Sequence, residues 1–192
     1  MINLAVFASG TGSNFDAIMD AIENGNLEAE VSLLVSDRID AGVIEKAQRR
    51  QIDTVVFNPK SFANKEAFEK ALLHDCKDRG VEWIVLAGYM RLIGLTLLTA
   101  YEHRILNIHP SLLPAFPGKD AIGQAFDSQV KVTGVTVHYV DDGMDTGPII
   151  DQEAVRIHEQ DTKEDIKQKI QAVEHELYPR VIQSLTIKEE SR

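Results

Sequence analysis

Short apolar runs alternate with amphipathic segments along the first half of the chain. Four of these runs are typical of strands buried on both faces of a sheet, at residues 2–8, 31–35, 54–57 and 81–87. The segments between them carry apolar side chains at helical spacing, at residues 15–24, 43–50 and 61–79. Strands that alternate with helices of about ten residues or more indicate βαβ units and a parallel sheet.

The pattern changes in the second half of the chain. Residues 104–106 predict a short buried strand, and residues 134–140 and 149–155 predict two strands that are neighbours or antiparallel. Thr162 with Asp165 three positions later is typical of a helix start. An apolar stripe then predicts a long terminal helix, at Ile166, Ile170, Val173, Leu177 and Val181.

These elements together predict one α/β domain over residues 1–192. We expect a mostly parallel, Rossmann-like central sheet flanked by helices, with antiparallel strands toward the C-terminal half and a long C-terminal helix. A chain of 192 residues is long enough to bury a substantial core.

Composition narrows the set of partners. The formal net charge of −10 disfavours binding to nucleic acid backbones and anionic membranes, and no run of lysine and arginine opposes it. Cys76 is the only cysteine, so an internal disulfide is excluded. No apolar run approaches the roughly 18 residues that span a bilayer. We expect a cytoplasmic protein, monomeric or homodimeric, that binds small molecules and neither nucleic acid nor membrane.

A glycine-containing loop lies between the first predicted strand and helix. Residues 9–14 read Ser-Gly-Thr-Gly-Ser-Asn, which lets the backbone approach a ligand at a helix start that attracts anions. Gly12, Ser13 and Asn14 therefore suit a single phosphate group. Phe15 stands where the dinucleotide fingerprint requires a third glycine, which disfavours a nicotinamide cofactor. A tight turn without a ligand is the alternative.

The segment at residues 107–114 reads Asn-Ile-His-Pro-Ser-Leu-Leu-Pro. Asn107 and His109 are two residues apart on a strand, so their side chains point to the same side. An amide and an imidazole aimed at one point can activate a carbonyl group. The acidic loop at residues 141–147 has a carboxylate, Asp145, that could reach the imidazole; a purely structural histidine is the alternative.

A metal site built from His109, His138 and Asp145 is a competing hypothesis. His138 falls in the middle of a predicted strand, and no paired ligand spacing of the His-Glu-x-x-His kind occurs. We therefore predict no metal. Residues 86–93 end a strand with an apolar ledge and Arg91, which suits a flat aromatic ligand with a carboxylate or carbonyl; an ordinary strand exit is the alternative.

Taken together, residues 8–14, 87–91, 107–114 and 141–148 closely resemble the phosphoribosylglycinamide formyltransferases, folate-dependent enzymes of purine synthesis. The resemblance covers nearly the whole chain, and its motifs agree in order and spacing. It implies transfer of the formyl group of 10-formyltetrahydrofolate, a co-substrate, to the amine of N1-(5-phosphoribosyl)glycinamide. It also implies a phosphate-binding half at residues 1–100 and a folate-binding and catalytic half at 101–192.

The resemblance assigns roles to individual residues. Asn107, His109 and Asp145 match the family's catalytic triad. Residues that match the binding site for phosphoribosylglycinamide are Gly12, Ser13, Asn14 and Glu174. Residues that match the binding site for the folate are Lys65, Met90, Arg91, Leu92, Ile93, Asn107 and Val140. Lys65 stands where some members have arginine, and residues 117–120 depart from members with histidines after the glycine.

The resemblance implies direct attack of the amine on the formyl carbon through a tetrahedral intermediate. Two alternatives remain for the activity. One is a formyltetrahydrofolate deformylase, which hydrolyses the same formyl group but usually has an additional N-terminal regulatory domain. The other is a non-catalytic module that binds a phosphorylated metabolite.

Overall fold

A computed structural model describes the backbone of residues 1–190 and the side chains of residues 1–185. Residues 191–192, the end of the predicted single domain, lie outside the described residues. The strands are β1 (Ile2–Phe7), β2 (Ala29–Ser36), β3 (Thr54–Val56), β4 (Trp83–Leu86), β5 (Ile105–His109), β6 (Val132–Tyr139) and β7 (Ile149–Arg156). The helices are α1 (Ser13–Glu23), α2 (Gly42–Arg49), α3 (Lys65–Asp78), α4 (Leu95–Ala100), α5 (Ala121–Asp127) and α6 (Lys163–Glu190), with a 3-10 turn, η1 (Pro59–Ser61).

The strands form one seven-stranded sheet in the order β3-β2-β1-β4-β5-β6-β7. Pairing is parallel from β3 to β5, and β6 and β7 add to this sheet in antiparallel fashion. The predicted α/β class, with its mostly parallel sheet, antiparallel C-terminal strands and long last helix, is confirmed.

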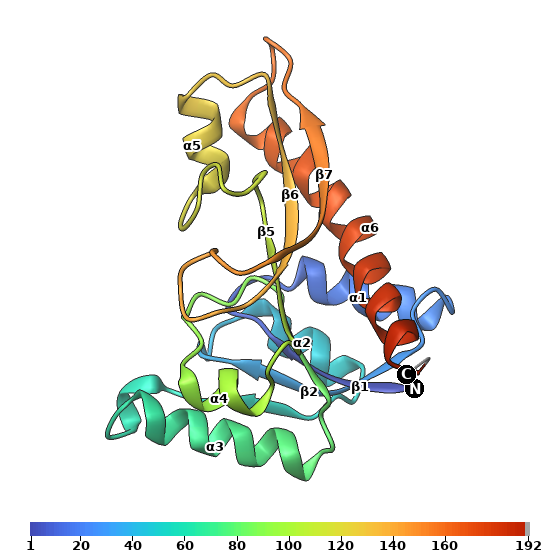
Figure 1. Cartoon of the computed structure of the whole chain (residues 1–192), viewed down its shortest axis with the longest axis vertical. Helices are drawn as coiled ribbons and strands as arrows, with labels where there is room; N and C mark the ends of the chain where they lie inside the picture. The colour runs from blue at the N-terminus through green and yellow to red at the C-terminus, as the bar shows by residue number, and fades with distance from the viewer. Residues whose placement is uncertain (191–192) are drawn as a thin grey trace.

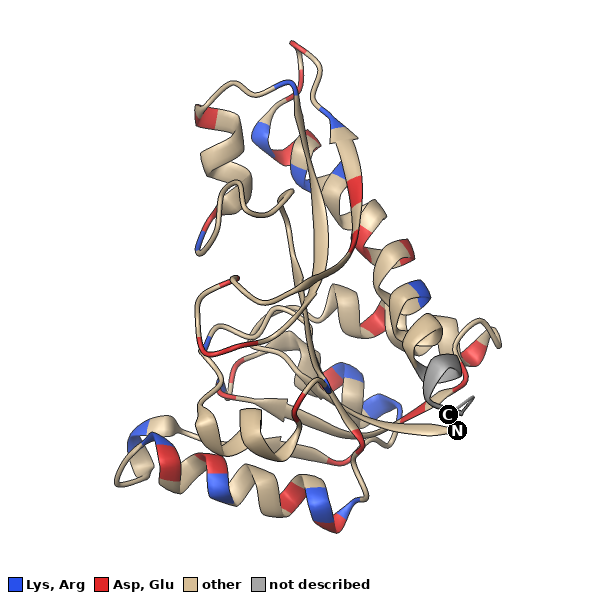
Figure 2. Ribbon diagram, viewed as in Figure 1, with Lys and Arg blue, Asp and Glu red and all other residues tan. Residues whose placement is uncertain are grey.

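Helices pack on both faces of the parallel part of the sheet (Figure 1). α1, α2 and α6 contribute to one apolar core, while α3 and α4 cover the core on the opposite face. Along α3 and the first turns of α6, acidic and basic residues are interspersed rather than separated (Figure 2). In the described part of the chain, no helix is long and apolar enough to cross a membrane.

The strand order opens a crevice next to β1. The segment after β1 leads into α1 on one face, whereas the segment after β4, the neighbour of β1, leads into α4 on the other face. In open α/β sheets, ligands bind outside the carboxyl ends of the strands at such a switch in direction. The loop at residues 9–14, the segment at 86–93 and the end of β5 all lie at this edge.

Several elements differ from the prediction. The helix expected from residue 61 begins at Lys65, because η1 comes first and the Asn64 side chain caps α3 by accepting the Ala67 N–H at 2.8 Å. The strand expected at 104–106 extends to His109. α4 and α5 were not predicted; they have six and seven residues, too few for a clear helical period.

The last helix anchors the second half of the chain to the sheet. The predicted stripe is buried at Ile166, Ile170, Leu177 and Val181, and Val173 is half-buried. Next to this stripe, the hydroxyl of the fully buried Tyr178 lies 2.9 Å from the Leu86 carbonyl oxygen and 3.2 Å from that of Leu106. α6 therefore satisfies backbone groups of both β4 and β5 at the level where the crevice opens.

Candidate active site

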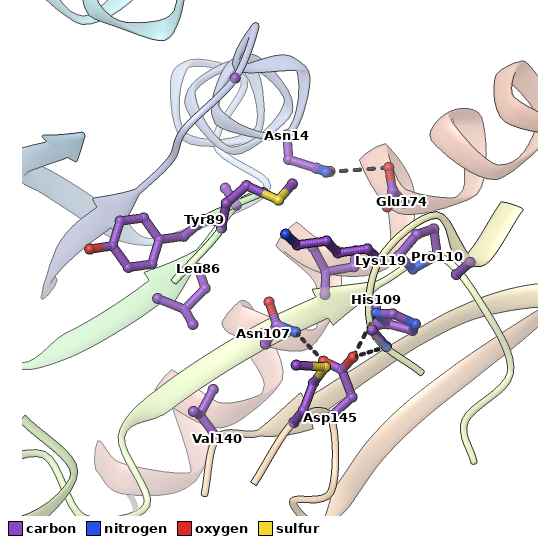
Figure 3. Close-up of a pocket in the computed structure, with 18 of the residues that line it drawn as sticks. Asn14, Leu86, Tyr89, Asn107, His109, Pro110, Lys119, Val140, Asp145 and Glu174 are labelled. Carbon is purple, nitrogen blue, oxygen red and sulfur yellow. Dashed lines mark hydrogen bonds and ion pairs between the residues drawn. The ribbon is translucent and has the colours of Figure 1, made fainter. Parts of the chain in front are cut away.

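A pocket of about 600 Å³ lies at the carboxyl edge of the sheet (Figure 3). Five parts of the chain far apart in sequence line it: the loop after β1, the end of β4 with the segment that follows, β5, the loop before α5 and the loop between β6 and β7. α6 closes one side with Gln171 and Glu174. Every predicted site residue except Lys65 lines this pocket.

The loop after β1 has the geometry of an anion site. Gly12 has a φ of 79°, and a Cβ there would approach the Val43 Cγ2 to 2.6 Å, so glycine is required. α1 begins at the next residue and has no side-chain cap. The first N–H groups of α1, at Ser13 and Asn14, lie at the pocket without an intrahelical partner, as helix starts do.

Asn14 joins this loop to the last helix. Its Nδ2 donates to Glu174 Oε2 at 3.3 Å, and the Glu174 side chain is almost completely buried. Burial raises the pKa of Glu174 to about 7, and the hydrogen bond from Asn14 opposes this rise only in part. The pocket therefore holds a carboxyl group that titrates near neutral pH.

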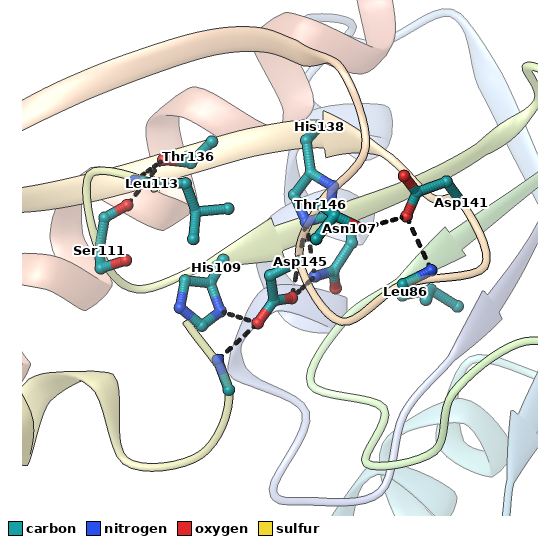
Figure 4. Close-up of polar contacts among 12 residues, drawn as sticks. Leu86, Asn107, His109, Ser111, Leu113, Thr136, His138, Asp141, Asp145 and Thr146 are labelled. Atoms are coloured by element: carbon teal, nitrogen blue, oxygen red, sulfur yellow. Dashed lines mark hydrogen bonds and ion pairs between the residues drawn. The ribbon is translucent and has the colours of Figure 1, made fainter. Parts of the chain in front are cut away.

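Asp145 is the point on which the predicted triad converges (Figure 4). His109 Nδ1 lies 3.3 Å from Asp145 Oδ2, and Asn107 Nδ2 donates to Asp145 Oδ1 at 3.4 Å. The Gly118 N–H donates to Oδ2 at 2.7 Å. Asp145 has a φ of 57°, a left-handed conformation that non-glycine residues rarely adopt and that is often found at functional sites.

Hydrogen bonding indicates the charge state of this cluster. His109 Nε2 lies 2.8 Å from the Phe116 carbonyl oxygen, so both ring nitrogens face acceptors and the protonated imidazolium satisfies both. Burial acts to raise the pKa of Asp145, but other interactions, among them the hydrogen bond from the Gly118 N–H and the charge of His109, outweigh it and lower the pKa. The lowered pKa keeps the Asp145 carboxylate ionised at neutral pH.

A second histidine sets the orientation of Asn107. His138 Nδ1 lies 2.7 Å from the Tyr139 carbonyl oxygen, which places the proton on Nδ1 and leaves Nε2 as an acceptor. Asn107 Nδ2 lies 3.1 Å from this Nε2. Both N–H groups of Asn107 are therefore directed at the protein, toward His138 and Asp145, and its carbonyl oxygen points into the pocket (Figure 3).

The opposite wall of the pocket is apolar and open. Met90 and Leu92 are 67% and 48% exposed, although both line the pocket, whereas Ile93 is buried and Val140 is half-buried. Exposed apolar side chains gathered in a concave site are typical of a surface that a ligand covers. The Arg91 guanidinium lies 5.4 Å from the centre of the Phe68 ring, and its buried Nε has no hydrogen-bond partner among the residues that the structure describes.

Lys65 lies outside the pocket lining. Its ammonium group is 3.9 Å from Glu69 Oε1 on the next turn of α3. Conversely, Gly118, Lys119 and Gln171 line the pocket but were not assigned from the sequence. The signal for Gly118 and Lys119 was weak because the segment at 117–120 departs from the family pattern, whereas Gln171 lies within the long last helix, where no motif marks it.

The side chains considered as metal ligands, His109, His138 and Asp145, do come together. Within residues 1–185, however, no group of three or more His, Cys, Asp or Glu side chains is arranged to hold a metal ion. Cys76 is buried in the core away from the pocket, and burial raises the pKa of its thiol. Its surroundings are those of a structural thiol.

Comparisons with known proteins identify the family of this chain. The family model described as formyl transferase matches residues 2–182. Phosphoribosylglycinamide formyltransferase of Bacillus subtilis (strain 168) is 57% identical over 185 residues, 96% of this chain and 95% of the relative. The enzyme of that name from Escherichia coli (strain K12) is 36% identical over 181 residues, 94% of this chain and 85% of the relative.

A solved structure gives the same result in three dimensions. Glycinamide ribonucleotide transformylase 1 from Geobacillus kaustophilus superimposes with a TM-score of 0.94 at 59% identity, over 96% of this chain and 98% of that chain. The resemblance inferred from the four sequence segments is thus confirmed across nearly the full length. With its fold, its motifs and its near-complete match to the family model in agreement, this chain belongs to the formyl transferase family.

Proposed function

We propose that this protein transfers the formyl group of 10-formyltetrahydrofolate to the amine of N1-(5-phosphoribosyl)glycinamide, a step of de novo purine biosynthesis. Membership of the family and the names of relatives that match end to end support this activity. The observation that carries it is the position of Asn107, His109 and Asp145 in one pocket, between an anion-binding loop and an apolar wall.

Each end of the pocket suits one substrate. We assign the ribotide phosphate to Gly12, Ser13 and Asn14, where backbone N–H groups and the start of α1 favour an anion. Glu174, next to Asn14, is then placed to accept a hydrogen bond from the glycinamide portion.

The folate suits the apolar wall. We assign it to Met90, Arg91, Leu92, Ile93 and Val140, with Asn107 at the inner end of the wall. Lys65 is retained only as a contact for the distal part of this ligand, since it lies outside the pocket lining. The 10-formyltetrahydrofolate is a co-substrate, and we propose that no metal takes part.

We propose that the two halves of the chain have different roles and that they share the folate site. We propose that residues 1–100 bind the phosphate and that residues 101–192 supply the catalytic residues. The folate site draws on both, because Met90 to Ile93 belong to the first half and Val140 to the second. We further propose a cytoplasmic location, with small-molecule substrates and no nucleic acid partner, in keeping with the net charge of −10.

The proposed reaction begins with orientation of the amine. The Asn107 carbonyl oxygen, which points into the pocket, accepts one N–H of the amine and turns its lone pair toward the formyl carbon. A C–N bond forms, and the formyl oxygen becomes an oxyanion. His109 Nδ1 lies 3.3 Å from Asp145 Oδ2, longer than the roughly 2.7–2.9 Å of strong charged hydrogen bonds, so an oxyanion that forms nearby can attract this donor.

Proton transfer completes the cycle. Before attack, the charge of Asp145 keeps His109 protonated and oriented; Asp145 then takes, directly or through water, the proton that the amine loses. Because interactions at the site lower the pKa of Asp145, the carboxyl group releases this proton readily. The C–N10 bond of the intermediate then breaks, and the folate nitrogen leaves with a proton. No covalent bond to the protein forms.

One assay distinguishes this activity from the two alternatives. The protein is supplied with 10-formyltetrahydrofolate, with and without the ribotide, and tetrahydrofolate, formate and formylated ribotide are measured. We expect tetrahydrofolate and formylated ribotide in equal amounts, only when the ribotide is present. Formate release without the ribotide would instead identify a deformylase. Binding of both ligands without turnover would identify a non-catalytic module.

A further inference from the structure

The phosphate loop contains no cationic side chain. Residues 9–14 are Ser-Gly-Thr-Gly-Ser-Asn, so their contribution to binding an anion comes from backbone N–H groups, hydroxyl and amide groups, and the start of α1. A helix start supplies roughly half an elementary charge, whereas a phosphate monoester carries about −1.5 to −2 at neutral pH. Glu174, which accepts a hydrogen bond from Asn14, places a carboxyl group beside this loop. The charge balance at this end of the pocket therefore calls for a cation.

Two permanently basic side chains line the pocket within the described residues, Arg91 and Lys119. Arg91 belongs to the apolar wall, where its guanidinium stacks on Phe68. Lys119 comes from the loop between β5 and α5. Figure 3 shows its side chain extending from the side of Pro110 across the pocket, with the ammonium group directed inward, toward the part where Asn14 lies.

The backbone that carries Lys119 is held in place on both sides. The preceding N–H, that of Gly118, donates to Asp145, and the Lys119 carbonyl oxygen accepts from Gln124 Nε2 at 2.9 Å. The neighbouring carboxylate of Asp120 is already engaged, since it accepts the Gly123 N–H at 3.2 Å and lies 2.9 Å from Lys163 Nζ. Within the described part of the chain, the Lys119 ammonium forms no hydrogen bond or ion pair of its own.

We propose that the ammonium group of Lys119 binds the phosphate of the ribotide and supplies the charge that the loop after β1 lacks. This inference rests on the proposed function and adds a residue to the binding site. A lysine acts on a phosphate as a mobile point charge, which fits an exposed side chain on a fixed backbone. Lys119 contributes to affinity and to preference for the phosphorylated amine, and the bond-making step uses other groups.

The test compares three variants by steady-state kinetics and calorimetry. Lys119→Met removes the charge but keeps the chain length, Lys119→Arg keeps the charge, and Lys167→Met is a control that removes an exposed lysine of α6 paired with Glu164. Two probes report on the phosphate site without catalysis: ribose 5-phosphate, and ribose as its uncharged counterpart.

We expect Lys119→Met to raise the KM for the ribotide and the Kd for ribose 5-phosphate by roughly 10- to 100-fold, the usual effect of losing a hydrogen bond to a charged group. The kcat, the KM for 10-formyltetrahydrofolate and the binding of ribose should change less than about twofold. The reason is that a contact to the phosphate is equally strong in the ground state and in the transition state, so its loss weakens binding of the ribotide without slowing the reaction step. Lys119→Arg should recover most of the loss, and Lys167→Met should match the unmodified protein.

Two results would overturn the proposal. An unchanged Kd for ribose 5-phosphate in Lys119→Met would show that the ammonium does not bind the phosphate. A lower kcat with unchanged KM would place Lys119 at the reacting centre instead. Failure of the proposed function is a separate result: the unmodified protein would then show no turnover with the ribotide, whatever Lys119→Met does to the binding of ribose 5-phosphate.

Discussion

Replacing Glu174 by glutamine isolates the effect of burying a carboxyl group on α6. The Glu174 side chain is 7% exposed, and its Oε2 accepts a hydrogen bond from Asn14 Nδ2 at 3.3 Å. Glutamine has the same shape and retains an oxygen that accepts from Asn14, but it carries no charge at any pH. The substitution therefore changes the electrostatic free energy and leaves the packing of α6 against α1 largely intact.

The sign of the effect follows from the direction of the pKa shift. Burial raises the pKa of Glu174 from 4.5 to about 7, so the folded protein binds the proton more tightly than the unfolded chain does. The stability that Glu174 contributes is fully present below pH 4.5 and is lost as the pH rises through about 7. At about 1.4 kcal/mol per pKa unit, the free energy of unfolding falls by about 3 kcal/mol in total. Roughly 2 to 3 kcal/mol of this decrease occurs between pH 5 and 8.

Urea unfolding at several pH values, followed by circular dichroism, measures this difference. We expect the stability of Glu174→Gln relative to the unmodified protein to rise by roughly 2 to 3 kcal/mol from pH 5 to pH 8. Effects of the substitution that do not depend on pH cancel in this comparison. Glu164→Gln, at an exposed position in the first turn of the same helix, is the matched control. A difference that stays constant from pH 5 to 8 would refute the reasoning.

Three further predictions follow from the site and its support. His109→Ala should lower kcat by about 10²- to 10³-fold with little change in the KM for the ribotide, measured by steady-state kinetics; near-normal turnover would contradict its role. Burial tends to raise the pKa of Asp145, but its interactions lower it, so the stability that its charge contributes is present above a pH of about 4 and is lost below it. Asp145→Asn should accordingly lose less stability between pH 5 and 3 than the unmodified protein does, measured as the free energy of unfolding at each pH. An equal loss in the two proteins would show that the charge of Asp145 does not stabilise the fold. Tyr178→Phe leaves the Leu86 and Leu106 carbonyl groups without the hydroxyl, which should cost about 1–3 kcal/mol in urea unfolding without lowering kcat; unchanged stability would disprove the contribution of that hydroxyl.

The parallel part of the sheet was predictable for a physical reason. Strands buried on both faces are continuous apolar runs, and β1 and β4 coincide with the predicted runs to within about two residues. The common direction of Asn107 and His109 also follows from the strand period of two. Short elements such as α4 contain too few residues to show a helical period. The predicted start of α3 was wrong because η1 precedes this helix.

The surroundings of the triad depended on contacts that no local pattern encodes. His138 meets Asn107 because the antiparallel register of β5 and β6 places these residues opposite each other. That register depends on how two distant segments pack, so the sequence suggested only that His138 lies in a strand. Asp145, which accepts the Gly118 N–H, also has a left-handed backbone conformation that sequence alone does not reveal.

The position of Glu174 on the last helix has a consequence for protein synthesis. The walls of the pocket are built from segments that begin at Gly10 and finish at Glu174. Ribosomes must therefore synthesise the chain through Glu174 before a complete binding site exists. Chains that terminate early should neither hold the phosphorylated amine nor consume the cell's supply of activated one-carbon units.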